Sequence, residues 1–283
     1  MIVVVAIVVI ASVWIGFFVL DSGGGAQSAE DMPPAAITDL APYFPDNSSV
    51  ELRWTAPGDD NNSGTAAQYD IRYASSAIDT EVKFAAAEQC IGEPTPSPPG
   101  TVQTFNVTNL MGDAIHYFVI KTADEVPNWS PLSNSIGLAP DFTLNDTVGT
   151  PWHLFAQIRN GKPILLQFMH PECIACQTAA QLLIPIYNNY SQDVEIVSAA
   201  VSFEVGCFNN PPTVAMIAAF MTQYGAVWRH VIESPGTQVR DAYGIVAVPT
   251  FFLIGKDGGI AYVHQGYGSM NDLVDAMEQA LLP

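Results

Sequence analysis

The chain has few positively charged residues. Its 283 residues include 9 Lys and Arg against 28 Asp and Glu, which gives a formal net charge of −19. Nucleic-acid binding needs basic side chains opposite the phosphates, and docking on anionic lipid headgroups needs clusters of them. The shortage therefore argues against both classes of partner. It favours a soluble surface on which like charges repel one another.

Charged residues of either sign are also scarce. They make up 13% of the chain, whereas hydrophobic residues make up 49%. A composition this apolar can bury a core, which excludes an intrinsically disordered chain. The length is sufficient for two domains, each with a core of its own.

Cysteine is limited to four residues, and two of them form a C-x-x-C pair, Cys173 and Cys176. A structural zinc site takes four ligands, and no second pair is present. Haem attachment needs a His directly after the second cysteine, where this chain has Gln177. An inert disulfide across so short a loop would add little stability. The pair is therefore interpreted as a redox-active disulfide, with no metal and no further cofactor expected.

The first residues lack charge altogether. Residues 2–20 form an apolar run that would extend roughly 28 Å as a helix, about the thickness of a bilayer core. No basic residue precedes it, unlike the usual secretory signal peptide. The prediction is an uncleaved transmembrane anchor at residues 1–20. A cleaved signal peptide and the assembly helix of a pilin-like filament are the alternatives. A flexible linker is expected over residues 21–35.

Asn-x-Ser/Thr triplets are frequent after the linker. Such triplets are acceptors for glycosylation in exported proteins. They begin at Asn47, Asn61, Asn106, Asn128, Asn145 and Asn189. Their number favours an extracytoplasmic location, either membrane-anchored or on the cell surface.

Residues 36–138 have the pattern of an all-β domain. Alternating runs such as "SVELRWTA" and "AQYDIRYAS" are separated by turn-formers such as "PGDDNNSG", which is typical of a β-sandwich. The segments "VELRWTAPGDD", "YDIRYA" and "HYFVIKTADEVPNWSPLSN" resemble a fibronectin type III domain. The resemblance places Trp54, Leu110 and Tyr117 in the core, and it implies a spacer or adhesion module.

Residues 139–283 alternate between strand and helix. "KPILLQFMH" and "VEIVSAAVSF" predict buried strands. Helices are predicted from Ile174 to Tyr190, with Leu182, Leu183 and Ile186 on one side, and over "TVAMIAAFMTQYG". A hairpin with "KDGG" at its turn and a final amphipathic helix follow. This order predicts an α/β sheet covered by helices.

Cys173 lies where a buried strand gives way to a helix. The backbone N–H groups and the dipole at a helix N-terminus stabilise negative charge there. The pKa of the Cys173 thiol should therefore be lowered, as a nucleophile requires. Cys176 follows one helical turn later, where it can displace a mixed disulfide from Cys173.

Three blocks in this half resemble the thioredoxin superfamily, and most of all its TlpA/ResA-like extracytoplasmic branch. They are "APDFTL" (139–144), "GKPILLQFMHPECIACQ" (161–177) and "YGIVAVPTFFLIGKDGGIAYVHQG" (243–266). The resemblance implies a thioredoxin-like fold with Cys173 as nucleophile and Cys176 as resolving thiol. It also implies that Val248 and Pro249 form a cis-proline loop facing both sulfurs.

Several positions depart from the family's pattern. Glu172 replaces the usual aromatic residue, and a carboxylate beside a thiolate should raise its pKa. The buried acid of thioredoxins falls on Gln167, and the acid of the cytochrome-maturation branch falls on Ala179. Proton transfer is then left to water, Glu172 or His170. His170 is interpreted at least as readily as a loop residue bonded to backbone.

Cys90 and Cys207 allow two readings: an interdomain disulfide, or two separate thiols. For the whole chain we expect an anchored thiol–disulfide oxidoreductase, of uncertain direction, that acts on cysteine-containing exported proteins. A membrane electron donor is a candidate partner. The alternatives are a surface filament subunit assembled through residues 2–20 and, because "APDFTL" also opens peroxiredoxin-like domains, a peroxidase.

Overall fold

The computed structural model describes residues 32–44, 50–107, 114–203, 208, 211–234, 238–268 and 270–282. No helix among these residues is both long and apolar enough to cross a membrane. The apolar run at residues 2–20, its linker as far as residue 31, Asn47, Leu110 and Cys207 lie outside the described residues. The anchor and its alternatives therefore stay predictions.

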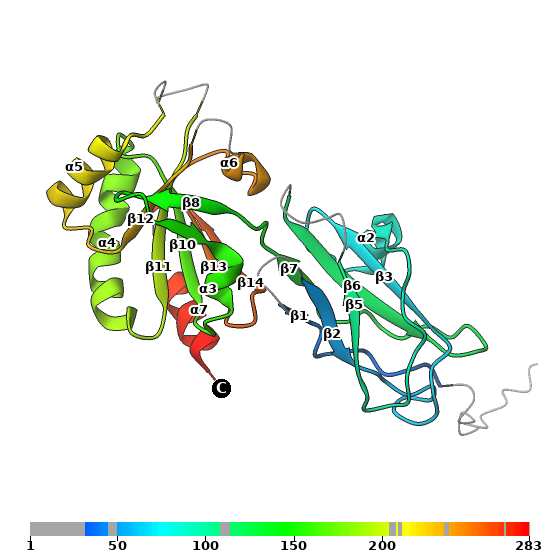
Figure 1. The fold of residues 1–283 in the computed structure, drawn as a ribbon. Coiled ribbons are helices and arrows are strands. Elements are labelled where there is room, and N and C mark those ends of the chain that lie inside the picture. Colours follow the sequence, from blue (N-terminus) through cyan, green and yellow to red (C-terminus); the bar gives the residue numbers. More distant parts are fainter. Residues whose placement is uncertain are drawn as a thin grey trace, which may run out of the picture. The chain divides into compact units, whose positions relative to one another are not determined.

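Two antiparallel sheets form the first part of the chain (Figure 1). The three-stranded sheet has the order β1-β2-β5 and the four-stranded sheet has the order β4-β3-β6-β7. Their bounds are β1 Ala41–Tyr43, β2 Glu51–Thr55, β3 Gln68–Ala74, β4 Glu88–Gln89, β5 Val102–Asn106, β6 His116–Ala123 and β7 Ile136–Leu138. The β-sandwich prediction agrees with these sheets, and its attribution to fibronectin type III stays a prediction.

Alternation along the strands explains the core of this part. Leu52 and Trp54 of β2 are buried together with Ile71 of β3, as the sequence pattern predicts. Tyr117, which was expected in the core, is only half-buried. Successive side chains of a strand point to opposite faces, and in β6 it is Phe118 that faces the core.

One short helix interrupts the expected all-β pattern. Helix α2 (Glu81–Ala86) is capped by the side chain of Thr80, which accepts a hydrogen bond from the Lys83 backbone at 3.3 Å. Its Phe84 packs with Ile78 against Val119, on the face of β6 that is turned away from the main core. The helix therefore covers a sheet face that would otherwise expose apolar surface.

The second part is built on a seven-stranded mixed sheet in the described residues, with the order β14-β13-β10-β11-β12-β8-β9. Its strands are β8 Thr143–Asp146, β9 Pro151–His153, β10 Ile164–Met169, β11 Glu195–Ala200, β12 Arg229–Ile232, β13 Thr250–Ile254 and β14 Ile260–Gln265. Its helices are α3 Leu154–Ile158, α4 Ile174–Tyr190, α5 Val214–Tyr224, α6 Val239–Ala242 and α7 Asn271–Leu281. Strands β10, β11 and β12 run parallel, while β13 runs antiparallel to β10.

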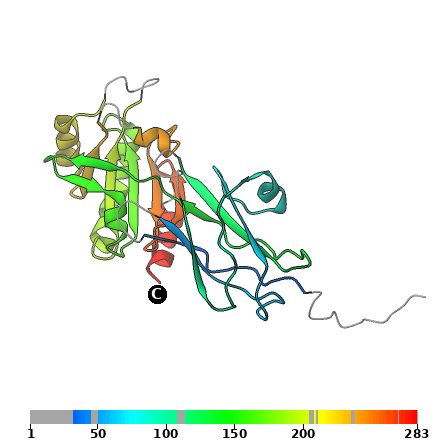
Figure 2. The ribbon, with the colours of Figure 1, turned by 45° about the vertical axis from the view of Figure 1, so that its right-hand side comes forward.

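Helices cover both faces of this sheet. One core cluster joins α4, α5 and α7 to the sheet, and another joins α3 and α6 to it. Figure 2 shows the orange helix α6 and the yellow helix α5 on opposite sides of the strands. The predicted thioredoxin-like α/β architecture is confirmed.

The ends of several elements agree with their sequence signals. Helix α5 begins after Thr213, whose hydroxyl accepts from the Met216 N–H at 3.2 Å, and it ends at Gly225, which has a φ of 68°. Helix α4 begins and ends where the sequence predicts. However, Leu182 is exposed, so the buried side of α4 is formed by Leu183 and Ile186 without it.

Candidate functional site

Cys173 stands at the N-cap of α4. Its φ and ψ of −77° and 114° are extended, and its carbonyl accepts the first helical bond from the Gln177 N–H at 3.0 Å. The Cys173 Sγ accepts a hydrogen bond from the Cys176 N–H at 3.3 Å. The sulfur thus occupies the place where a capping oxygen usually satisfies the free N–H groups of a first turn. The predicted position at the helix N-terminus is what the structure shows.

The two sulfurs differ in accessibility. Both thiols are free, Cys173 is 6% exposed, and Cys176 is completely buried. The leading cysteine therefore keeps a small exposed surface, whereas the second has none. This asymmetry suits a nucleophile followed by a resolving thiol.

Their acidities differ in the same sense. The Cys176 thiol donates a hydrogen bond to Cys173, and together with backbone N–H groups of Cys176 and Ala175 it lowers the pKa of Cys173 to about 6 despite burial. Burial raises the pKa of Cys176 well above its usual range, and the bond to Cys173 raises it further. At neutral pH the pair therefore holds one thiolate, on Cys173, and one thiol, on Cys176.

The cis-proline loop meets Cys173. The peptide bond between Val248 and Pro249 is cis, and the Cys173 thiol donates to the Val248 carbonyl with a distance of 3.5 Å from sulfur to oxygen. The sheet explains this meeting, because antiparallel pairing places Thr250, at the start of β13, opposite Phe168, near the end of β10. The loop before β13 and the turn after β10 therefore share one edge of the sheet.

The two candidate modulators lie on either side of Pro171 but in different surroundings. His170 is completely buried, and its ring stacks on Phe208 with centroids 4.4 Å apart. Its Nδ1 accepts from the Glu172 N–H at 3.3 Å, and its carbonyl accepts from the Cys173 N–H at 3.1 Å. These contacts fit the role of a loop residue that shapes the turn. The Glu172 side chain is exposed, so solvent screens its charge from the thiolate.

A buried series of hydrogen bonds joins Gln167, Ser198 and Trp228 on the sheet face beneath α4. The sequence analysis identified only Gln167. Gln167 occupies the position of the thioredoxin acid, between Leu165 and Met169, on the face of β10 that packs with Cys176. Its Oε1 accepts from the Ser198 hydroxyl at 2.7 Å, and that hydroxyl accepts from the Trp228 indole N–H at 2.8 Å. Gln167 Nε2 has no partner among the described residues. The available sequence signal for this site was Ser198, a polar residue inside the buried apolar run "VEIVSAAVSF".

The remaining candidate residues lie apart from this centre. Cys90 is a buried free thiol in the sandwich core, and burial raises its pKa to about 12. Because Cys207 is outside the described residues, a bridge between them stays a prediction. The described residues contain no group of three or more His, Cys, Asp or Glu side chains that could hold a metal ion.

The glycosylation candidates differ in accessibility. Four of them are exposed: Asn61, Asn106, Asn145 and Asn189. Asn128 is half-buried, and its side-chain amide donates to Asp124 at 2.8 Å. A glycan on that nitrogen would replace this bond, so the structure suits Asn128 least. Modification of any of these positions stays a prediction.

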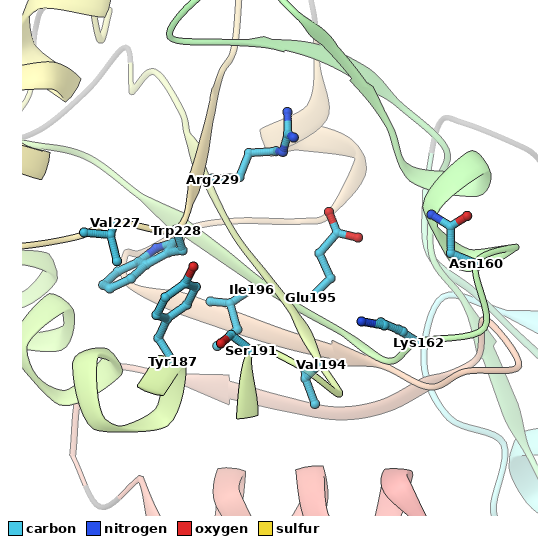
Figure 3. Close-up of a pocket in the computed structure, with 10 residues that line it drawn as sticks. All are labelled: Asn160, Lys162, Tyr187, Ser191, Val194, Glu195, Ile196, Val227, Trp228 and Arg229. Atoms are coloured by element: carbon cyan, nitrogen blue, oxygen red, sulfur yellow. The ribbon is translucent and has the colours of Figure 1, made fainter. Parts of the chain in front are cut away.

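A cleft of about 450 Å³ lies at the opposite end of α4 (Figure 3). Its charged side chains already have protein partners. Lys162 donates to the Gln192 carbonyl at 2.6 Å, Glu195 accepts from the Trp152 indole at 2.7 Å, and Arg229 pairs with Asp146 at 2.8 Å. The cleft adjoins Tyr187 and Ser191, about four helical turns from Cys173. It therefore takes no part in the chemistry of the cysteines.

Comparisons with known proteins find a family model for the C-terminal half and two kinds of relative. The AhpC/TSA family model matches residues 137–263. The thiol-disulfide oxidoreductase ResA of Halalkalibacterium halodurans is 30% identical over 146 residues, which cover 51% of this chain and 76% of that protein. A crystal structure of a putative thiol:disulfide interchange protein DsbE from Chlorobium tepidum covers 51% of this chain and 96% of that one, with 22% identity and a TM-score of 0.44.

A different relative matches a shorter stretch. Calcium-activated chloride channel regulator 1 of Homo sapiens is 42% identical over 69 residues, which are 24% of this chain. The chain spans only 8% of the length of that protein. The similarity is therefore confined to a small segment of a much longer relative.

Proposed function

Because the chain belongs, through its C-terminal half, to the ResA-like thiol-disulfide oxidoreductases of the thioredoxin superfamily, we propose that it exchanges disulfides with cysteine-containing exported proteins through Cys173 and Cys176. The observation that carries this proposal is the paired acidity of the two sulfurs. A lowered pKa, of about 6, makes Cys173 a thiolate near neutral pH, while Cys176 stays a buried thiol. Only the thiolate form attacks a disulfide.

The exchange has two steps. The Cys173 thiolate attacks one sulfur of a substrate disulfide, forms a mixed disulfide and releases the other substrate sulfur as a thiolate, which takes up a proton. The Cys176 thiol then loses its proton and attacks the Cys173 sulfur. This forms the Cys173–Cys176 disulfide and releases the second substrate thiol. Two electrons pass to the substrate, and the reverse sequence oxidises it.

The protein contributes geometry to each step. In the thiolate form Cys173 no longer donates to Val248, so the Val248 carbonyl becomes free to accept an N–H from an extended substrate. The N–H groups of the first turn of α4 remain directed at the sulfur that carries the charge. Gln167 cannot ionise, so the proton of Cys176 passes to water or to the departing substrate thiolate.

The proposal also includes a location. Residues 2–20 would anchor the chain in a membrane, with both folded parts outside the cytoplasm and the β-sandwich acting as a spacer. A dithiol donor in the membrane would return electrons to the Cys173–Cys176 disulfide. Support for the anchor is the charge-free run itself. Membrane fractionation of cells that carry the full chain, compared with a chain lacking residues 2–20, tests it, and an unchanged distribution would refute the anchor.

The reaction is tested by reduction of insulin with a dithiol as electron source. The full chain should accelerate the reduction, and Cys173→Ser should abolish the acceleration. Cys90→Ala is the matched control, since it removes a cysteine that lies in the sandwich core. Equal activity of the wild type and Cys173→Ser would reject the proposal.

Peroxide reduction is a second candidate because of the match with the AhpC/TSA family model. The residue three positions before Cys173 is the fully buried His170 instead of the Thr usual in peroxiredoxins. Slow or absent turnover of hydrogen peroxide is therefore expected. A filament role would appear as surface polymers that disappear on deletion of residues 2–20, and no described residue favours it.

A further inference from the structure

The turn between β10 and α4 places Cys173 at the start of the helix, and hydrogen bonds close this turn on both sides of Pro171. The Cys173 N–H donates to the His170 carbonyl at 3.1 Å, and the Glu172 N–H donates to His170 Nδ1 at 3.3 Å. The Pro171 carbonyl accepts from the side-chain amide of Gln177 at 3.1 Å. Two of these bonds end on His170, so the conformation of the turn depends on that residue.

The side chain of His170 is itself held in place. It is completely buried, and its ring stacks on the Phe208 ring with the two planes inclined by 17°. Nδ1 accepts from the Glu172 N–H only when it carries no proton, so the neutral ring carries its proton on Nε2. Without this acceptor the Glu172 N–H would lose its partner in a partly buried turn, and the observed conformation would be destabilised.

The backbone of His170 contacts both cysteines. Its carbonyl accepts from the Cys173 N–H, and its own N–H bonds to the Cys176 sulfur. Burial raises the pKa of Cys176, and this bond from His170 opposes the rise. The Cys176 N–H in turn donates to the Cys173 sulfur at 3.3 Å. Because a hydrogen bond weakens steeply as its angle closes, a small displacement of the turn would weaken the bonds that stabilise the Cys173 thiolate.

We propose that His170 is a positioning residue for disulfide exchange: its side chain holds the turn so that the N–H groups of α4 stay directed at the Cys173 sulfur. This role depends on the proposed exchange, and it adds to that exchange a residue that the sequence left as a candidate for proton transfer. Nδ1 of His170 already accepts from Glu172, and Nε2 carries the ring proton. Neither nitrogen therefore has a free lone pair for the proton of Cys176.

Two substitutions of His170 separate its acceptor from its ring. His170→Asn retains an acceptor, because asparagine commonly accepts from the N–H two residues further on. His170→Phe retains a ring against Phe208 but has no acceptor. His116→Phe is the matched control: His116 is half-buried in β6, its Nδ1 bonds to the Ala114 carbonyl at 3.1 Å, and its ring centroid lies 5.5 Å from that of Tyr73.

The readout is the pH profile of alkylation of Cys173 by iodoacetamide in the reduced full chain. Loss of one well-directed hydrogen bond to a charged sulfur raises a pKa by about one unit. In His170→Phe the midpoint should therefore rise from about 6 to about 7, and alkylation at pH 5 should slow about tenfold. His170→Asn and His116→Phe should titrate with the wild type. Gln177→Leu removes the bond to the Pro171 carbonyl, so it should raise the midpoint too, and it replaces His170→Phe if that variant does not fold.

Urea unfolding and insulin reduction at pH 7 complete the test. A midpoint raised in His170→Phe but not in His170→Asn supports the positioning role, provided that His170→Asn also reduces insulin like the wild type. A lowered free energy of unfolding in His170→Phe with an unchanged midpoint would overturn it, because His170 would then only stabilise the fold. A normal midpoint in His170→Asn with insulin reduction lost would overturn it in favour of proton transfer by the imidazole. Insulin left unreduced by the wild type would instead refute the proposed function.

Discussion

The acidity of Cys173 depends on its neighbour, and substitution of Cys176 by alanine measures how much. The first cause of the lowered pKa of Cys173 is the hydrogen bond from the Cys176 thiol, and the backbone N–H groups add to it. Cys176→Ala removes the thiol donor and leaves the N–H of residue 176, which is 3.3 Å from the sulfur in the wild type.

The size of the effect follows from the type of bond. A hydrogen bond to a charged group contributes about 1.5–3 kcal/mol, and a thiol is a weak donor at the lower end of that range. One pKa unit corresponds to about 1.4 kcal/mol, so the pKa of Cys173 should rise by about one unit in Cys176→Ala. Because the wild-type pKa is about 6, the variant should titrate near pH 7.

The assay is the rate of alkylation of Cys173 by iodoacetamide between pH 4 and 10, read from the peptide that contains this residue. In the wild type the rate should rise through pH 6 and level off above it. Cys176→Ser keeps an O–H donor and should titrate close to the wild type. A wild-type midpoint near 9 would refute the assignment of a thiolate, and an unchanged midpoint in Cys176→Ala would show that the backbone of α4 alone lowers the pKa.

Three further predictions concern the surroundings of the pair. Ser198→Ala leaves Gln167 Oε1 and Trp228 Nε1 buried without partners, so urea unfolding should show a loss of about 2 kcal/mol in the free energy of unfolding. A loss below about 0.5 kcal/mol would mean that these hydrogen bonds do not stabilise the fold. Gln167→Glu places a carboxyl with a burial-raised pKa on the sheet face beneath α4, so the pH profile of exchange should gain a second inflection above pH 6; a single inflection would contradict this. The reduction potential, measured against glutathione, should lie between about −270 and −120 mV, because the pKa of Cys173 falls between the values for the reactive cysteines of thioredoxin and DsbA. A value outside that interval would show that the acidity of Cys173 does not determine the potential.

The sequence predicted the elements that carry the cysteines because their signals are local. The buried run of β10 and the periodicity of α4 place Cys173 at a helix start without any tertiary information. The backbone part of the lowered pKa follows from that position, and its largest cause, the hydrogen bond from the Cys176 thiol, follows from the C-x-x-C spacing. Glu172 was expected to raise the pKa of Cys173, but that pKa is lowered. The Glu172 side chain is exposed to solvent, and its exposure depends on folded surroundings that the local sequence does not contain.

Features that depend on pairing between distant segments were less accessible. The local sequence favoured no particular isomer at Val248-Pro249, and only the family resemblance pointed to the cis form that the structure shows. The hairpin of β8 and β9, helix α3 and helix α2 are too short for a periodic signal, and they were missed. The bonds of Ser198 to Gln167 and Trp228 join three strands or strand ends, so no single window of sequence contains them.

The most direct test of the central claim is to trap the mixed disulfide. Full-length Cys176→Ser, reduced and then mixed with a disulfide-containing substrate protein, cannot complete the second step. Mass spectrometry of the digested complex should find the substrate cysteine joined to Cys173. No covalent complex, or one joined through Cys90 or Cys207 instead, would contradict the assignment of Cys173 as the attacking sulfur.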